Sequence, residues 1–397
     1  MNGNIRQRTP GSWTIQWYLG IGPNGRKRYE SKTVRGTKKE AQTELRRVVH
    51  EVEHGTYVES GKITVGDFLR HWLKDYASTA VAGTSYERYE GIVEQHLIPA
   101  FGHIPLHRLQ PIQVQEYYTE AQKSGRVKPV RDREGNVTAK GLSAQTVKHH
   151  HAVLRKALNC AVRWQIVGRN VCHAVDPPRV PSKERLAFTE AEVQALVRYS
   201  DGTPYGPLIL IAASAGMRLG EVLALTWADL DTKNGAIAVT KSLEQTRAGL
   251  SIKEPKSERG RRNIPLPTNV VNRLIAYHEQ QEAQAEAAGE LWADNNLICC
   301  DEIGRYRNPE STSNAFLRLT RRAGVRPLGI HALRHAHATM LANRGWNAKI
   351  IQERLGHSTI TTTMNIYAHV LPTTQQEAAD SLSGVFCHSD AILLRDT

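Results

Sequence analysis

The sequence contains no long hydrophobic run. Its longest apolar stretch, PLILIAASAGM at 207–217, is far shorter than the roughly 20 residues that a membrane-spanning helix needs. The N-terminus also lacks a charged segment followed by an apolar one, which is the pattern of a secretory signal. We therefore expect a soluble, cytoplasmic protein that has no membrane partner.

Cysteine is scarce and shows no binding pattern. The 397 residues include five cysteines, an odd number, and none forms a C-x-x-C pair. Neither a disulfide framework nor a zinc cluster is indicated, so we expect reduced thiols. The nucleotide-binding motif G-x-x-x-x-G-K-[ST] is missing too. We predict no metal and no cofactor.

Acidic residues are outnumbered. Lys and Arg total 52 against 39 Asp and Glu, which gives a net charge of +13 and a pI near 9.6. This balance is typical of a protein whose partner carries phosphates. On charge alone, a merely soluble basic protein is an equal alternative.

The first 62 residues combine a strand pattern with strong basicity. Residues 12–19, SWTIQWYL, alternate Trp and aliphatic side chains with polar ones, which predicts a half-buried strand. The following GIGPNG matches a dinucleotide-binding pattern, but no helix pattern follows it, so a turn is favoured. This segment holds twelve Lys/Arg against six Glu. We expect a sheet that reads a DNA groove, with a solvated basic face as the alternative; its candidate DNA-binding residues are Arg26, Lys27, Arg28 and Lys32.

The middle of the chain is helical. Four helix patterns follow one another between 63 and 167, the first beginning at a Thr64 cap, and Lys148 in the fourth is another candidate DNA-binding residue. A polar, turn-rich insertion at 124–141 predicts an exposed flap. The proline-rich stretch at 168–185 indicates a linker. Beyond it, 186–385 mixes helices with short strands such as GAIAVT and RRNIPL, and 386–397 is a tail.

Residues 331–370 gather histidines and arginines around an expected helix, HALRHAHATMLANRG. His331 and Arg334 lie three residues apart and project from one face of that helix, which His335 approximately shares. The two histidines could instead hold a metal, but H-E-x-x-H is absent and no third ligand is evident nearby. His357 and Tyr367 follow in LGH and NIY; a lone tyrosine is more often structural.

Two further segments carry candidate residues. Arg218 and Glu221 stand at the start of an apolar helix, where Glu221 could orient an arginine that is costly to bury unpaired. The hairpin-like IKEPKSERGRRNIPLP places Lys256 in a loop, with Lys253 as a rival. The five basic residues of that stretch could equally form a phosphate-binding surface.

This set of residue types suits phosphoryl transfer without a metal. Guanidinium groups can hold the non-bridging oxygens of a pentacovalent phosphate bidentately. Tyrosine ionises only near pH 10, so it needs a base or a strong positive field to attack. A mobile lysine can protonate the leaving alkoxide.

The ordered motifs GMRLGE, HALRH, LGH and NIY resemble those of the tyrosine recombinase family, specifically the phage-type integrases. The resemblance implies that Arg218, His331 and Arg334 hold the scissile phosphate and that Lys256 is the general acid. It further implies that His357 hydrogen-bonds the phosphate and that Tyr367 becomes linked to the DNA 3′-phosphate. Glu221 and His335 are supporting residues.

The resemblance also implies an architecture. We expect a multidomain, mainly α-helical fold with small β-sheets (α+β). Its parts are an arm-site-type DNA-binding domain with a three-stranded sheet and a helix (1–62), a helical core-binding bundle (63–167), and a mixed α/β catalytic domain (186–385).

The implied function is site-specific recombination that integrates, and also excises, a phage or mobile element in a bacterial host cell. The implied partners are double-stranded attachment sites, three further copies of the chain in a synaptic tetramer, a DNA-bending host protein and an excisionase. Two alternatives remain: a DNA-binding regulator on an inactive recombinase scaffold, and a type IB topoisomerase.

Overall fold

The computed structural model describes residues 3–21, 25–53, 63–132, 134–181, 186–254 and 260–367, together with 380 and 382. The chain divides into two compact units, Met1–Ser182 and Lys183–Thr397. The described residues are mainly helical with small antiparallel sheets, so the predicted fold class is confirmed. No helix among them is both long and apolar enough to cross a membrane.

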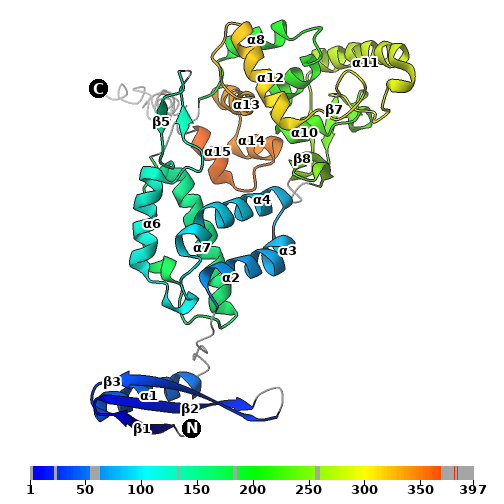
Figure 1. The fold of residues 1–397 in the computed structure, drawn as a ribbon. Coiled ribbons are helices and arrows are strands. Elements are labelled where there is room, and N and C mark those ends of the chain that lie inside the picture. The colour runs from blue at the N-terminus through cyan, green and yellow to red at the C-terminus, as the bar shows by residue number, and fades with distance from the viewer. Residues whose placement is uncertain are drawn as a thin grey trace, which may run out of the picture. The chain divides into compact units, whose positions relative to one another are not determined.

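The N-terminal part is a three-stranded sheet with one helix. The strands run in the order β1 (Asn4–Thr9), β2 (Ser12–Ile21) and β3 (Lys27–Arg35), and α1 (Lys38–Glu53) lies along one face of the sheet (Figure 1). Ile15 and Trp17 are buried against Ala41 and Val48 of α1. The strand predicted at 12–19, with these two side chains inward, is therefore confirmed.

The four helical segments predicted after this sheet are also present. They are α2 (Val65–Trp72) continuing through a π-turn (Leu73–Ala77) into α3 (Ser78–Ala80), α4 (Gly83–Ile92) continuing through a π-turn (Val93–Leu97) into α5 (Ile98–Phe101), α6 (Pro111–Ser124), and α7 (Ala144–Arg163). Thr64 caps α2 as expected: its hydroxyl accepts from the Asp67 backbone N–H, and the Asp67 carboxylate accepts from the Thr64 N–H. We call these four segments the helical bundle.

The insertion between α6 and α7 forms a short hairpin of β4 (Val130–Arg131) and β5 (Val137–Ala139). None of the described residues in these strands is buried, in agreement with the predicted exposed flap.

The core of the helical bundle includes two tyrosine–histidine pairs. The Tyr117 hydroxyl lies 2.7 Å from His150 Nδ1, and the Tyr118 hydroxyl lies 2.7 Å from His151 Nδ1. Both histidines are buried. Burial lowers the pKa of His150 to about 4, assisted by His96 and His149, so the ring is neutral at pH 7.

The second unit mixes helices and short strands around one large apolar core. Its helices are α8 (Glu190–Tyr199), α9 (Gly206–Ala215), α10 (Leu219–Leu223), α11 (Thr268–Ala288), α12 (Pro309–Arg322), α13 (His331–Asn343), α14 (Ala348–Leu355) and α15 (Ile360–Tyr367). Its strands are β6 (Leu230–Asp231), β7 (Ala236–Val239), β8 (Ser242–Thr246), β9 (Gly249–Lys253) and β10 (Arg262–Pro265). The strands predicted in GAIAVT and RRNIPL are β7 and β10, which pair with each other.

Candidate active site

Arg218 stands where the chain turns from α9 into α10. Gly216 ends α9 in the left-handed conformation, with φ 63°, and Arg218 then caps α10. Its backbone N–H donates to Glu221 Oε2 at 3.0 Å, and its Nη1 donates to Glu221 Oε1 at 2.8 Å. Glu221 is buried while the Arg218 side chain is 43% exposed, so the carboxylate fixes an arginine that still reaches the surface.

Arg334 reaches the same place from α13. It lies on the buried face of this helix and is 3% exposed. Its Nη1 donates to the Gly216 carbonyl at 2.8 Å and its Nη2 to the Leu355 carbonyl at 2.7 Å. The next carbonyl, of Gly356, accepts from Arg218 Nη2 at 3.1 Å.

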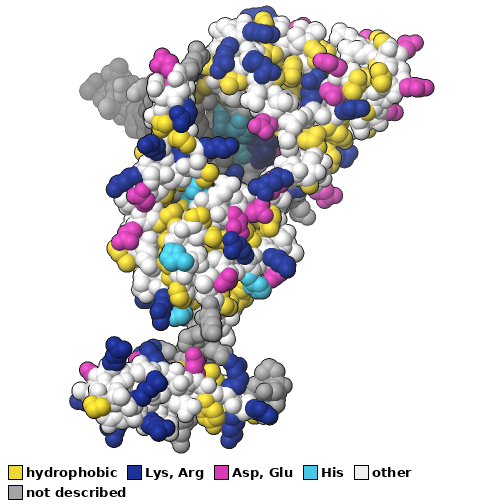
Figure 2. All heavy atoms as spheres, in the orientation of Figure 1, with side chains coloured by type: hydrophobic (Ala, Val, Ile, Leu, Met, Phe, Trp, Pro, Cys, Tyr) yellow, Lys and Arg dark blue, Asp and Glu magenta, His cyan; other side chains and the backbone are white. Residues whose placement is uncertain are grey.

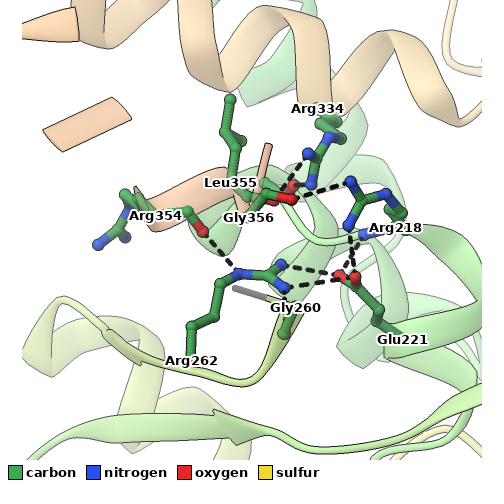
Figure 3. A network of polar contacts seen from close by, with 9 residues as sticks. Arg218, Glu221, Gly260, Arg262, Arg334, Arg354, Leu355 and Gly356 are labelled. Carbon is green, nitrogen blue, oxygen red and sulfur yellow. Dashed lines mark hydrogen bonds and ion pairs between the residues drawn. The ribbon is translucent and has the colours of Figure 1, made fainter. Parts of the chain in front are cut away.

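A third arginine, Arg262 of β10, completes this arrangement. Its Nε donates to the Arg354 carbonyl at 2.8 Å, and its Nη2 donates to Glu221 Oε2 at 2.8 Å. Three guanidinium groups from three elements thus converge on successive carbonyls at the end of α14 (Figure 3). The last carbonyls of a helix lack intrahelical partners and carry partial negative charge, so they suit cations. We call Arg218, Arg262 and Arg334 the arginine cluster.

The arginine cluster carries more positive charge than its single carboxylate balances. Burial opposes ionisation of Glu221, yet hydrogen bonds and charge from Arg262, together with Arg218, hold its pKa below its ordinary value. Burial, followed by repulsion from Arg218, lowers the pKa of Arg334 to about 9, so the group remains charged at pH 7. An anion beside Arg218 and Arg334 would relieve this repulsion.

His357 follows Gly356, the residue that caps the end of α14. Its Nδ1 lies 2.9 Å from the Thr363 hydroxyl on α15, and its backbone carbonyl accepts from Gln352 Nε2 at 3.1 Å. Burial, followed by the positive charges of Arg334 and Arg218, lowers the pKa of His357 to about 4. The ring is therefore neutral at pH 7 and can donate only one N–H to a phosphate.

His331 and His335 lie one turn apart on α13, with ring centroids 4.8 Å apart in an edge-to-face arrangement. Both rings help to lower the pKa of His357, so they belong to the same electrostatic environment. Within the part of the chain that the structure describes, no three His, Cys, Asp or Glu side chains are grouped so as to hold a metal ion.

Two predicted residues fall partly or wholly outside the described structure. Tyr367 ends α15, but only its backbone is described. Lys256 lies in 255–259, outside the described residues. Its rival, Lys253, ends β9 and forms an ion pair with Glu244 of β8.

The hairpin interpretation of the segment around Lys256 was wrong. β9 pairs with β8, whereas β10 pairs with β7, so the strands on either side of Lys256 belong to different sheets. The hairpin-like pattern of IKEPKSERGRRNIPLP comes from two separate strands, each of which pairs with a strand earlier in the chain.

Sequence reasoning missed Arg262, Arg354 and His337. Arg354 donates from Nε to His337 Nε2 at 3.0 Å, and His337 Nδ1 lies 2.9 Å from the Ala213 carbonyl, which ties α14 to α13 and α9. Of these three residues, only Arg262 had a feature in the sequence that could have indicated it. It stands two residues before Ile264 on the same strand and so shares that buried residue's face.

The basic residues predicted to bind DNA lie in different surroundings. Lys148 is an exposed residue of α7, and Arg26, Lys27 and Arg28 are exposed at the β2–β3 turn. Lys32, however, pairs in register with Ile15 and donates to Glu44 of α1 at 2.6 Å, so it lies toward α1. On the face shown in Figure 2, Lys and Arg outnumber Asp and Glu over the N-terminal sheet.

The opposite face of that sheet, which α1 does not cover, is polar. Rows of paired residues cross its three strands: Arg6, Thr14 and Thr33 in one row, and Asn4, Gln16 and Ser31 in the next. We call these six residues the open face. Of these, only Thr14 is partly buried.

Two family models match the chain. Residues 187–374 match the phage integrase family, and residues 64–121 match the phage integrase N-terminal SAM-like domain. A XerC-like tyrosine recombinase of Caldanaerobacter subterraneus is 26% identical over 370 residues, covering 88% of this chain and 90% of that protein. An integrase of Streptomyces ambofaciens is 26% identical and covers 94% of this chain and 93% of that protein.

Solved structures share the fold. The Tn1549 transposon integrase in complex with transposon right end DNA aligns with a TM-score of 0.66 at 23% identity, covering 81% of this chain and 99% of that one. A lambda integrase dimer bound to a COC′ core site aligns with a TM-score of 0.55 at 16% identity, covering 92% of this chain and 94% of that one. From the motifs and the two family matches, which together span more than half of its length, the chain belongs to the phage integrase family of tyrosine recombinases, enzymes that cut and rejoin DNA at specific sites.

Proposed function

We propose that the chain is the integrase of a phage or other mobile element and that Tyr367 is its nucleophile. The Tyr367 hydroxyl gives its proton to His331 as its oxygen forms a bond to the scissile phosphorus; the bond from phosphorus to the 5′ oxygen breaks, and Lys256 gives that oxygen a proton. The resulting 3′-phosphotyrosyl link keeps the energy of the phosphodiester. The 5′-hydroxyl of the exchanging strand then attacks this link and restores Tyr367, so no nucleotide cofactor is needed.

The remaining roles fall to the arginines and histidines. Arg218 and Arg334 hold the non-bridging oxygens, His331 contributes to phosphate binding and proton transfer, and His357 donates a hydrogen bond. His335 and Glu221 support these groups. The observation that carries the proposal is the convergence of Arg218 and Arg334 beside His357, with excess positive charge and part of Arg218 exposed. A phosphodiester is the anion that this arrangement suits.

We further propose that the N-terminal sheet binds arm-type DNA sites through the open face. Amide, hydroxyl and guanidinium groups on adjacent strands are the donors and acceptors that base edges in the major groove require, and the exposed basic residues at the β2–β3 turn suit the flanking phosphates. Lys148 on α7 is proposed as a backbone contact in the core site.

The assembly and setting are part of the same proposal. Four copies bridge two duplexes and exchange strands in pairs through a four-way junction, in the cytoplasm of a bacterial host, with a DNA-bending protein and an excisionase setting direction. Support comes from similar proteins, which include an integrase of Staphylococcus phage L54a and a lambda integrase whose structure was solved as a tetramer bound to a Holliday junction.

The test is covalent trapping on a nicked substrate. Wild type and Tyr367→Phe are incubated with labelled DNA carrying the element's candidate attachment site and a nick just beyond the cleavage position. We expect a 3′-linked adduct on a denaturing gel from wild type and none from Tyr367→Phe, although both bind the DNA. Tight binding without an adduct from either protein, on a site that a related active integrase cuts, would favour the regulator. Relaxation of plasmids of any sequence, without synapsis, would favour the topoisomerase.

A further inference from the structure

The side chain of Arg262 is buried, and four of its five N–H groups donate to acceptors within the protein. Its side chain is only 7% exposed, and both terminal nitrogens donate to the Glu221 carboxylate, at 3.3 and 2.8 Å. Nη1 also donates to the Gly260 carbonyl at 3.1 Å, and Nε donates to the Arg354 carbonyl at 2.8 Å. Arg334 uses only two N–H groups in hydrogen bonds to carbonyls, whereas Arg262 uses four within the protein, so we do not expect Arg262 to bind DNA itself.

Arg262 shares its carboxylate with Arg218. Each Glu221 oxygen accepts from both residues: Oε1 from Arg218 Nη1 and Arg262 Nη1, and Oε2 from the Arg218 backbone and Arg262 Nη2. Arg218 alone contacts both oxygens, and Arg262 adds a second, charge-assisted contact to each of them, so the carboxylate is held by two guanidinium groups instead of one. Arg262 therefore restrains the carboxylate that orients Arg218.

The second contact of Arg262 concerns the end of α14. The carbonyl that it holds, that of Arg354, directly precedes the two carbonyls that receive Arg334 and Arg218, and His357 comes next in the chain (Figure 3). The left-handed Gly356 makes the chain turn at this point. Holding the Arg354 carbonyl therefore restrains the Leu355 and Gly356 carbonyls and His357, which follow it in the chain.

We propose that Arg262 is a positioning residue that aligns Arg218, through Glu221, with the α14 end and His357 before the phosphate arrives. The inference rests on the proposed function. Preorganised hydrogen-bond donors stabilise a transition state because they need no rearrangement during the reaction. A residue that only supports the fold would alter stability or DNA affinity but not the rate of cleavage by folded, DNA-saturated protein.

The experiment compares adduct formation at saturating nicked attachment-site DNA with DNA affinity measured separately. For Arg262→Gln we expect the saturated rate to fall by about 10- to 100-fold, as for a small misplacement of reacting groups. Affinity is expected to stay within about threefold, because Arg262 does not touch DNA. Arg262→Lys keeps the charge but cannot bridge two oxygens, so we expect its saturated rate to fall by about tenfold. This variant carries the test if Arg262→Gln does not fold.

A matched control and a double mutant isolate the mechanism. Arg273 of α11 also pairs with a carboxylate, that of Asp201 at 2.7 Å, away from the cluster, and Arg273→Gln should leave the saturated rate unchanged. In a Glu221→Gln background, Arg262→Gln should add less than about a threefold loss, because the two residues act as one unit. An unchanged saturated rate in folded Arg262 variants, a loss of affinity alone, or an equal loss in both backgrounds would overturn the inference. Failure of wild type to form any Tyr367-dependent adduct would instead refute the proposed function.

Discussion

The helical bundle and the second unit bury polar side chains of opposite character. In the bundle, His150 and His151 are neutral at pH 7, and each meets one tyrosine hydroxyl. In the second unit, the side chains of Arg262 and Arg334 are buried; Glu221 pairs with Arg262 and Arg218, whereas Arg334 donates to backbone carbonyls. In a neutral tyrosine–histidine pair each group is the hydrogen-bond partner of the other, whereas a cluster with excess positive charge favours a bound anion. With the proposed function, the comparison separates buried polar groups that pair within the fold from buried polar groups that we propose bind a phosphate.

The largest effect is expected from removing the carboxylate of Glu221, which pairs with two members of the arginine cluster. Glu221→Ala leaves Arg262 buried without its partner, and we expect a loss of about 3–5 kcal/mol in the free energy of unfolding. Denaturant unfolding of the purified chain, with hydrogen exchange to locate the loss near α10 and β10, measures it. Glu190→Ala, which breaks an exposed pair with Arg344, is the control and should cost no more than about 1 kcal/mol. An equal loss of unfolding free energy in the two variants would contradict the role of Glu221 as the partner of a buried charge.

The second prediction concerns catalysis. Arg334→Gln removes a preorganised donor, so adduct formation on nicked DNA should fall by about 10²- to 10³-fold. The effect should persist at saturating DNA, since Arg334 is proposed to act on the reacting phosphate. A variant that binds weakly yet cleaves at the normal rate once bound would refute this role.

The buried, neutral histidines of the helical bundle can be tested by changing the pH. The pKa of His150 is about 4 in the folded protein against 6.5 ordinarily, so the unfolded chain takes up its proton first. Stability from this group is complete above about pH 6.5 and is lost as the pH falls toward 4. Between pH 7 and pH 5 we expect the bundle to lose about 1–2 kcal/mol, seen as faster hydrogen exchange in α6 and α7. His150→Gln should flatten this dependence; an unchanged slope would show that other groups cause it.

The smallest expected effect is that of sulfate, and one experiment compares its effect on the second unit with its effect on the helical bundle. Sulfate at about five times its dissociation constant should stabilise the second unit by about 1 kcal/mol. Hydrogen exchange should slow near α13 and α14 and stay unchanged in α6 and α7. Protection that is equal in both regions would indicate a general salt effect rather than an anion site.

Local features of the fold were predictable because they follow from short-range chemistry. The alternation at 12–19, the Thr64 capping box and the helix beginning at His331 are each determined by residues within a few positions of one another. The carbonyls that receive the arginine cluster were not predictable. Every residue has a backbone carbonyl, so the residue type does not show which carbonyl will accept a hydrogen bond. The contact between Arg334 and Gly216 also joins residues 118 positions apart. The pairing of β9 and β10 with earlier strands was hidden for the same reason.

Gly216 places an unusual limit on how this enzyme can be engineered. A Cβ built at this position would lie 2.7 Å from the His337 ring and 2.8 Å from a Leu355 methyl group, and the residue has a positive φ. Its carbonyl also accepts from Arg334. Libraries that vary DNA recognition should therefore keep residue 216 fixed and place their diversity elsewhere, for example on the open face, where we propose that arm-type sites bind.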